Sequence, residues 1–300
     1  MQKITPNLWF DDDAEAAVGF YTSLFDRSSV GATSRYDEAA AAFSGQPEGS
    51  VLTVEFELAG HQFVALNGGP QFSFTPALSF IVNCPTTDEV DELWSSLSAG
   101  GETLMPLDSY PFSDRYGWTE DAYGVSWQLL YADDMPERSI VPSLLFVGER
   151  CGQAEDAIEF YTSLFSETAI GDIARYGPDQ APDEEGTVMY GDFTLAGQRF
   201  AAMDSAQAHD FDFTEAISFI VDCEDQNEVD YYWEELTANG GDESQCGWLK
   251  DRYGVSWQIV PTVLTDLLAD EDAEKAGRVM EAMLEMQKLD IEELEAAYAG

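Results

Sequence analysis

The chain consists largely of one sequence pattern that occurs twice. The hexapeptide Tyr-Gly-Val-Ser-Trp-Gln at residues 123–128 recurs at residues 253–258, and Phe-Tyr-Thr-Ser-Leu-Phe at residues 20–25 recurs at residues 160–165. Matching segments are therefore about 130–140 residues apart. Solenoid repeats are only about 20–50 residues long. This longer spacing predicts a duplicated domain, with one copy at residues 1–135 and the other at 136–262.

Each copy predicts a strand, a helix and three further strands, and then the same order again. In the first copy, alternating apolar residues predict a strand at residues 4–10, and Asp13 can cap the helix that follows. The order restarts with a strand at 77–83 and a helix after the capping pair Thr86 and Glu89. The remaining strands are expected at about 30–36, 51–58, 62–67, 102–106, 115–119 and 125–131. The predicted fold class is α+β, with four βαβββ modules in two domains.

Residues 263–300 lie outside the repeat and predict a helical tail. Val279, Met280, Met283 and Leu284 fall on one helical face. An apolar stripe of this kind must be buried. The tail is therefore expected to pack either on its own chain or on a second subunit.

The balance of charges excludes some partners. The chain has 58 Asp and Glu against 13 Lys and Arg, a formal net charge of −45. Such a chain repels nucleic acid and anionic membranes. The acidic residues are scattered through amphipathic segments, which predicts an acidic surface adapted to molar salt, where charges are screened within about 3 Å.

The sequence predicts a cytoplasmic protein. No apolar run reaches the roughly 18 residues that a membrane span needs, and the N-terminus lacks the pattern of a signal peptide. Four cysteines without a Cys-x-x-Cys pair are typical of a reduced compartment.

The modules resemble those of the vicinal oxygen chelate superfamily, which includes glyoxalase I, bleomycin-resistance proteins and extradiol dioxygenases. The chain is most similar to the PhnB-like group, whose domains are labelled 3-demethylubiquinone-9 3-methyltransferase, through segments 66–69 and 247–261. The resemblance covers residues 1–262. It implies two glyoxalase/bleomycin-resistance-type domains, each with a sheet-lined cleft, and pairing of the two domains within the chain, with a homodimer also possible.

The residues of a metal site are not at the expected positions. In metal-dependent members of the superfamily, His and Glu on the first and last strands of the modules hold a divalent ion. The last-strand position is Gln128 in one copy and Gln258 in the other, and a neutral amide is a weak ligand for such ions. His61 and His209 have no partner at ligand spacing and are predicted to be surface residues. We therefore expect no metal, and no motif indicates a cofactor.

The expected clefts are lined by aromatic and amide side chains. On the first strand, Leu8 and Phe10 are predicted to face the helices and Asn7 and Trp9 the cleft. Trp127 and Trp257, opposite the glutamines, are predicted to fill the core. The candidate ligand-binding residues are Asn7, Trp9, Asn67, Ser79, Trp118 and Gln128 in the first copy, and Ser143, Asp204, Ser218, Trp248 and Gln258 in the second. A longer loop at residues 105–115 is expected over the first cleft, which is the preferred functional one.

Two functional hypotheses follow. The first is a metal-independent protein that binds a small aromatic or amphipathic molecule in a cleft. The alternative is an enzyme of the superfamily, either a methyltransferase, as the group's label implies, or a metal-dependent lyase or dioxygenase. The sequence identifies no catalytic residue and leaves open whether the protein is an enzyme.

Overall fold

The computed structural model describes residues 2–133, 135–270 and 272–300. The first copy contains β1 Ile4–Phe10, α1 Ala14–Leu24, β2 Ser29–Arg35, α2 Glu38–Ser44, β3 Val51–Leu58, β4 His61–Asn67, β5 Leu78–Cys84, α3 Thr87–Leu97, β6 Glu102–Tyr110, β7 Ser113–Glu120 and β8 Ser126–Tyr131. The second contains β9 Ser139–Val147, the 3₁₀ turn η1 Gly148–Arg150, α4 Ala154–Leu164, β10 Ala169–Arg175, β11 Val188–Leu195, β12 Gln198–Ser205, β13 Ile217–Cys223, α5 Gln226–Thr237, β14 Asp242–Glu243, β15 Trp248–Lys250 and β16 Ser256–Pro261. The tail follows as α6 Thr262–Leu268, α7 Ala273–Glu285 and α8 Ile291–Ala299. This order confirms the four predicted βαβββ modules and the helical tail, with α2 as an unpredicted addition.

The strands form two eight-stranded sheets, and each sheet takes one module from each copy. Sheet A has the order β14-β15-β16-β13-β1-β4-β3-β2, and sheet B has the order β10-β11-β12-β9-β5-β8-β7-β6. The copies join where β1 pairs antiparallel with β13, and where β5 pairs antiparallel with β9. The two copies are therefore paired within the chain through continuous sheets.

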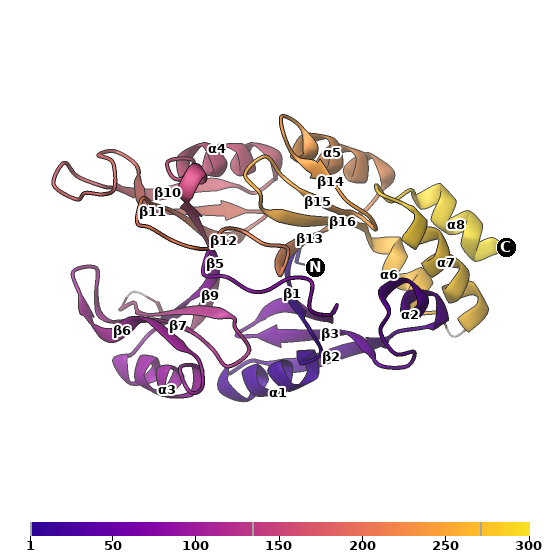
Figure 1. Ribbon diagram of the computed structural model, residues 1–300, viewed down its shortest axis with the longest axis horizontal. Helices are drawn as coiled ribbons and strands as arrows, with labels where there is room; N and C mark the ends of the chain where they lie inside the picture. Colours follow the sequence, from indigo (N-terminus) through magenta and orange to yellow (C-terminus); the bar gives the residue numbers. More distant parts are fainter. Residues whose placement is uncertain (1, 134, 271) are drawn as a thin grey trace.

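The sheets lie back to back around the main core (Figure 1). Helices α1 and α5 contact the strands of sheet A, and α3 and α4 contact those of sheet B. Leu8 and Phe10 belong to this core, as predicted, and so do Trp127 and Trp257, which are 0% and 1% exposed. Side chains of alternate parity lie on the opposite face of each sheet, away from the main core. After the clefts expected from the sequence, we call this outward face of sheet A cleft A and that of sheet B cleft B.

A buried Tyr–Asp–Trp network fixes the turn before the last strand of each copy. The Asp121 carboxylate accepts hydrogen bonds from Tyr21 Oη at 2.7 Å and Trp127 Nε1 at 2.8 Å. The backbone N–H groups of Tyr123 and Val125 donate to the same carboxylate. In the second copy Asp251 has the corresponding partners, Tyr161 and Trp257, at 2.6 and 2.8 Å. This network links the two repeated motifs to each other.

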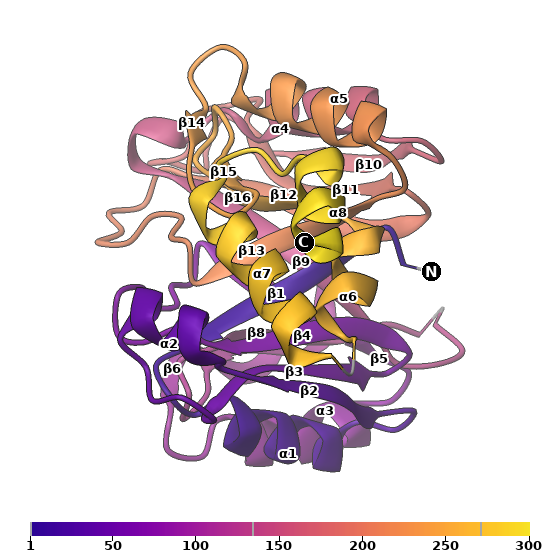
Figure 2. The ribbon, with the colours of Figure 1, turned by 90° about the vertical axis from the view of Figure 1, so that its right-hand side faces the viewer.

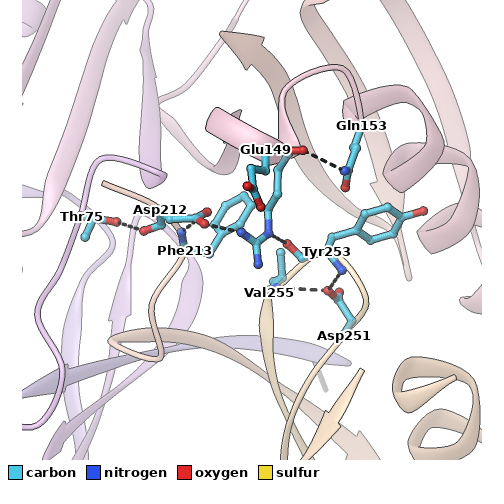
Figure 3. Close-up of polar contacts among 9 residues, drawn as sticks. Thr75, Glu149, Gln153, Asp212, Phe213, Asp251, Tyr253 and Val255 are labelled. Carbon is cyan, nitrogen blue, oxygen red and sulfur yellow. Dashed lines mark hydrogen bonds and ion pairs between the residues drawn. The ribbon is translucent and has the colours of Figure 1, made fainter. Parts of the chain in front are cut away.

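In the second copy, Arg150 also binds this turn from outside. Its partners Tyr253 and Asp212 are labelled in Figure 3. Its guanidinium donates to the backbone oxygen of Tyr253, next to Asp251, and also pairs with Asp212. Thr75 Oγ1 of the first copy donates to the Asp212 backbone oxygen at 2.8 Å. Arg150 therefore ties the turn at Asp251 to the loops that join the two copies.

The tail packs on its own chain, which is one of the two alternatives that the sequence predicted. Leu264, Val279 and Leu289 form a cluster with Val260 of β16, and Met280 packs on α2 in the first copy. The tail therefore bridges the two halves of sheet A and lies in front of its strands (Figure 2). Dimerisation stays a prediction. Among the described residues, no helix is both long and apolar enough to cross a membrane.

Two local predictions were wrong. Residues 105–115 are not a loop over a cleft, because β6 and β7 pair as an antiparallel hairpin through that region. Asp13 makes no side-chain cap for α1. Asn67 Oδ1 accepts from the Ala14 backbone N–H instead, at 2.9 Å. A long-range partner thus replaces the local cap that the sequence suggested, whereas the Thr86 cap of α3 is confirmed.

We expect the Tyr161→Phe substitution to lower the free energy of unfolding by about 1.5–3 kcal/mol, because it removes a hydrogen bond to a buried carboxylate. Urea denaturation measures this. The matched control is Tyr231→Phe, whose hydroxyl bonds to a neutral backbone oxygen at a site where the side chain is 43% exposed. Equal losses for the two variants would contradict the structural role of the Asp251 network.

The excess of carboxylates has few cationic partners. Among the described residues, eight ion pairs satisfy a 4 Å criterion, including Lys3–Glu228 and Arg138–Glu89. With 58 acidic residues in the chain, most carboxylates have no cationic partner among the described residues. The folded state therefore repels itself wherever salt does not screen it.

We expect the thermal unfolding midpoint to rise continuously with KCl up to molar concentrations. Screening relieves repulsion that is greater in the compact state than in the unfolded chain. Each kcal/mol gained raises the midpoint by about 2–4 °C for a chain of this size class. Calorimetry at increasing KCl measures it, with sucrose as an uncharged control. A midpoint independent of salt would contradict both this argument and the predicted adaptation to salt.

Candidate functional site

The predicted cleft residues are grouped differently from the sequence prediction. Asn7 and Trp9 lie in cleft A, together with Ser218, Trp248 and Gln258 of the second copy. Ser79, Trp118 and Gln128 lie in cleft B, together with Ser143. Assigning one cleft to each copy was wrong, because the strands pair between copies at β1–β13 and β5–β9.

Asn67 and Asp204 hold backbone rather than lining a cleft. Asn67 accepts from Ala14 N–H and donates to the Val51 backbone oxygen. Asp204 accepts from the backbone N–H groups of Gly152, Ala154 and Val188 at 2.7–3.1 Å. Burial raises the pKa of the Asp204 carboxyl, although these donors oppose the shift. Both side chains fix the start of a helix in their own copy.

Cleft B contains a buried chain of polar side chains. Tyr116 Oη donates to Gln128 Oε1 at 2.7 Å, and Gln128 Nε2 donates to Ser79 Oγ at 2.8 Å. Burial raises the pKa of Tyr116, so its hydroxyl keeps its proton. Between the same two strands, Trp118 Nε1 of β7 donates to Ser126 Oγ of β8 at 2.7 Å. The glutamine amide thus has a partner at each end.

Cleft A has a similar polar centre and more aromatic side chains. Gln258 Nε2 donates to Ser218 Oγ at 3.0 Å, and Asn7 Nδ2 lies 3.5 Å from the same oxygen. The Trp9 ring packs edge-on against Trp248, with centroids 5.9 Å apart, and its Nε1 donates to the Gly69 backbone oxygen at 2.8 Å. Cys246, in the turn before β15, takes the position that Tyr116 has in cleft B. Aromatic packing therefore dominates this face.

Each cleft has one buried hydroxyl without a hydrogen-bond partner among the described residues. In cleft B it is Ser143, which is 0% exposed and lies opposite Ser79 across the β5–β9 pair. In cleft A it is Ser256, whose counterpart Ser126 receives the Trp118 indole N–H. An unmet buried hydroxyl costs about 1–3 kcal/mol. A bound molecule that supplies a polar atom recovers this energy.

The clefts differ most at the end of the first strand. In cleft A the Trp9 ring occupies the space beside Gly68, where a Cβ would lie 2.2 Å from the ring. Cleft B has Leu145 in place of Trp9 and Ser205 in place of Gly68. His209 packs on Phe211 there, with centroids 4.7 Å apart, as Trp9 packs on Phe72 at 4.9 Å in cleft A. The smaller Leu145 leaves room for a polar group in cleft B.

The tail covers only one of the two clefts. Val260 lies on the same face of β16 as Gln258. It packs against the cluster formed by α6–α8. The backbone N–H groups of Cys246 and Gly247 bond to the oxygens of Met286 and Gln287. Among the described residues, no helix lies in front of sheet B in the same way (Figure 1).

The described residues do not bring metal ligands together. Groups of three or more His, Cys, Asp or Glu side chains suited to a metal ion do not occur within residues 2–133, 135–270 and 272–300. The two glutamines at the superfamily's ligand position are bonded to serine hydroxyls. This donor set does not fit a divalent ion.

Sequence reasoning missed Tyr116, Ser205 and His209. His209 was expected at the surface without a partner, but its Nε2 lies 2.9 Å from Ser205 Oγ and the ring is half-buried. The signal was available in the duplication, because Trp9 and Gly68 are replaced together by Leu145 and Ser205. A pair of coupled replacements indicates side chains in contact.

The comparisons with known proteins agree with this architecture. The family model of 3-demethylubiquinone-9 3-methyltransferase matches residues 2–130 and 138–260. A putative 3-demethylubiquinone-9 3-methyltransferase, PhnB protein, from Bacillus cereus is 47% identical, with 44% of this chain and 100% of that chain covered and a TM-score of 0.40. Glyoxalase I from Zea mays is 10% identical, with 90% and 98% covered and a TM-score of 0.55. No curated protein matches the chain.

Four βαβββ modules in two domains give the chain the fold of glyoxalase I. More particularly, the chain belongs to the 3-demethylubiquinone-9 3-methyltransferase family, whose model matches it twice. The likeness to the maize enzyme supports the fold alone. The double match to the family model confirms the sequence resemblance to the group labelled 3-demethylubiquinone-9 3-methyltransferase and, with it, to the vicinal oxygen chelate superfamily.

Proposed function

We propose that the protein binds one small organic molecule in cleft B, without a metal ion. The observation that carries the proposal is the difference between two equivalent faces. Cleft A is occupied by Trp9 and covered by the tail, whereas cleft B has the smaller Leu145 in place of Trp9 and the buried Tyr116–Gln128–Ser79 chain. Each cleft also has one buried hydroxyl without a partner among the described residues, which is Ser143 in cleft B.

The side chains of cleft B select the kind of ligand. Trp118, Leu130 and Tyr190 are partly exposed and offer apolar and aromatic surface. The Ser79 and Ser143 hydroxyls each keep a hydrogen to donate, so they suit a ligand carbonyl or hydroxyl oxygen. The net charge of −45 disfavours an anion. The expected ligand is a neutral or cationic, flat, amphipathic molecule.

The ligand meets aromatic side chains before polar ones. Trp118 is partly exposed, but Gln128 is 5% exposed and Ser143 is 0% exposed. Contact with the serines therefore requires neighbouring side chains to move. The family description names a demethylated ubiquinone, and a quinone ring, flat and bearing carbonyl oxygens, belongs to the proposed ligand class.

We expect Trp118→Ala to weaken binding of Nile red, a neutral planar dye with a carbonyl oxygen, by about three- to tenfold. An aromatic pair contributes about 0.5–1.5 kcal/mol, and 1.4 kcal/mol corresponds to tenfold. Fluorescence titration in molar KCl measures affinity and stoichiometry. The matched control is Trp248→Ala, the equivalent residue of cleft A, which should leave the dissociation constant unchanged.

Two outcomes would contradict the proposal. Equal weakening by both substitutions, or two dye molecules per chain, would show that cleft A also binds. Loss of binding after dialysis against EDTA, with recovery on adding a divalent ion, would show that a metal takes part.

A further inference from the structure

Ser205 and His209 form a hydroxyl–imidazole pair that the binding proposal does not use. Ser205 ends β12, and His209 follows four residues later in the loop. Ser205 Oγ and His209 Nε2 are 2.9 Å apart. The imidazole packs on the Phe211 ring, with an interplanar angle of 39°, which restrains its orientation. The pair has the contact distance of a nucleophile and its base.

The neighbouring bonds are compatible with donation from the serine to the imidazole. The Gln207 backbone N–H donates to Ser205 Oγ at 3.3 Å. In the tautomer of His209 that carries its proton on Nδ1, Nε2 accepts the single hydrogen of the serine hydroxyl. Burial lowers the pKa of His209, against the opposing effect of Asp183 and Asp210. A neutral imidazole that accepts the serine proton is the arrangement a general base needs.

The pair occurs in only one half of the duplication. The equivalent of Ser205 is Gly68, beside which the Trp9 ring leaves no room for a Cβ. Leu145 replaces Trp9 in cleft B. Ser205 lies on the same face of β12 as Ala201, which packs with Ile81 and Val141 on the outward side of sheet B. The hydroxyl and the imidazole therefore both lie at the end of cleft B.

We propose that Ser205 is a nucleophile that accepts an acyl group from a neutral activated ester, with His209 as its general base. Ser205 Oγ attacks the ester carbonyl carbon while its proton passes to His209 Nε2. The carbonyl–oxygen bond to the leaving group breaks, and the proton goes to the departing alkoxide or phenoxide. Water then hydrolyses the serine ester with the same base, which restores Ser205 and releases the acid.

The charges around the pair favour a neutral substrate. Asp183 accepts from the Ala206 backbone N–H at 2.7 Å, and its charge, like that of Asp210, stabilises an imidazolium at His209. The same carboxylates repel an anionic ester. This inference goes beyond ligand binding in cleft B and does not depend on it, since it concerns a reaction at one end of the cleft.

The thiol of Cys151 is a second group near Ser205 that could accept the acyl group. The Ser205 backbone N–H faces Cys151, whose pKa is raised by burial and by the carboxylates of Asp204, Asp183 and Glu184. A thiol that stays protonated is a poor nucleophile. Acylation should therefore select Ser205 over Cys151 even though the two lie close together.

The test uses the full chain and p-nitrophenyl acetate in molar KCl at neutral pH. Release of p-nitrophenolate gives the rate, and peptide mass spectrometry locates the acetyl group. The variants are Ser205→Ala and His209→Gln, and the matched control is His61→Gln, which removes the other histidine of the chain. Circular dichroism checks that each variant is folded.

We expect the acetyl group on Ser205 in the wild type and in His61→Gln, and none at this position in Ser205→Ala. His209→Gln should release p-nitrophenolate at least about 100-fold more slowly than His61→Gln, because general bases contribute about 10²–10⁴-fold. An acetyl group on Cys151 or on surface lysines only, or equal rates in the two histidine variants, would overturn the proposal. A folded wild-type protein that is not acetylated would overturn it as well.

Discussion

The buried carboxylates of Asp121 and Asp251 hold the architecture together. Each accepts four hydrogen bonds, from a tyrosine, a tryptophan and two backbone N–H groups. Burial raises the pKa of both carboxyls and the donors oppose it. In each copy, the network joins the first helix, which contacts one sheet, to the last strand of that copy, which belongs to the other sheet. The hydrogen-bond network connects elements within each copy, whereas strand pairing connects the two copies. Together they interlock the two halves of the chain.

This interlocking explains why both clefts contain residues from both copies. The first strand of each copy, β1 or β9, pairs with the strand that begins the second module of the other copy, β13 or β5. A replacement in one copy therefore changes a cleft to which both copies contribute. Trp9 faces Trp248 across the join, while Leu145, its counterpart, leaves room for Ser205 and His209. Divergence of two side chains is thus enough to make one cleft aromatic and the other polar.

The sequence predicted the modules well because they depend on local periodicity and on a repeat that provides each pattern twice. The inward and outward sides of β1 and the packing of Trp127 and Trp257 followed from alternation and were correct. The composition of the clefts was not predictable from the same signals. Strand order across the join is a long-range property, and neither Asn7 nor Ser143 has a sequence feature that names its partner strand. For the same reason Asn67 and Asp204 looked like cleft residues, although they hold helix starts.

The tail and Trp9 have complementary consequences for cleft A. Trp9 fills the inner end beside Gly68, and α6–α8 bury Val260 at the outer edge, so the face is closed from two sides by apolar contacts. A duplicated domain that needed two equivalent sites would be constrained to keep both faces alike. Each face keeps one buried hydroxyl without a partner among the described residues, Ser256 in cleft A and Ser143 in cleft B, and each lowers stability. The two faces differ instead in the apolar contacts of Trp9 and the tail, through which cleft A stabilises the pairing of the two copies.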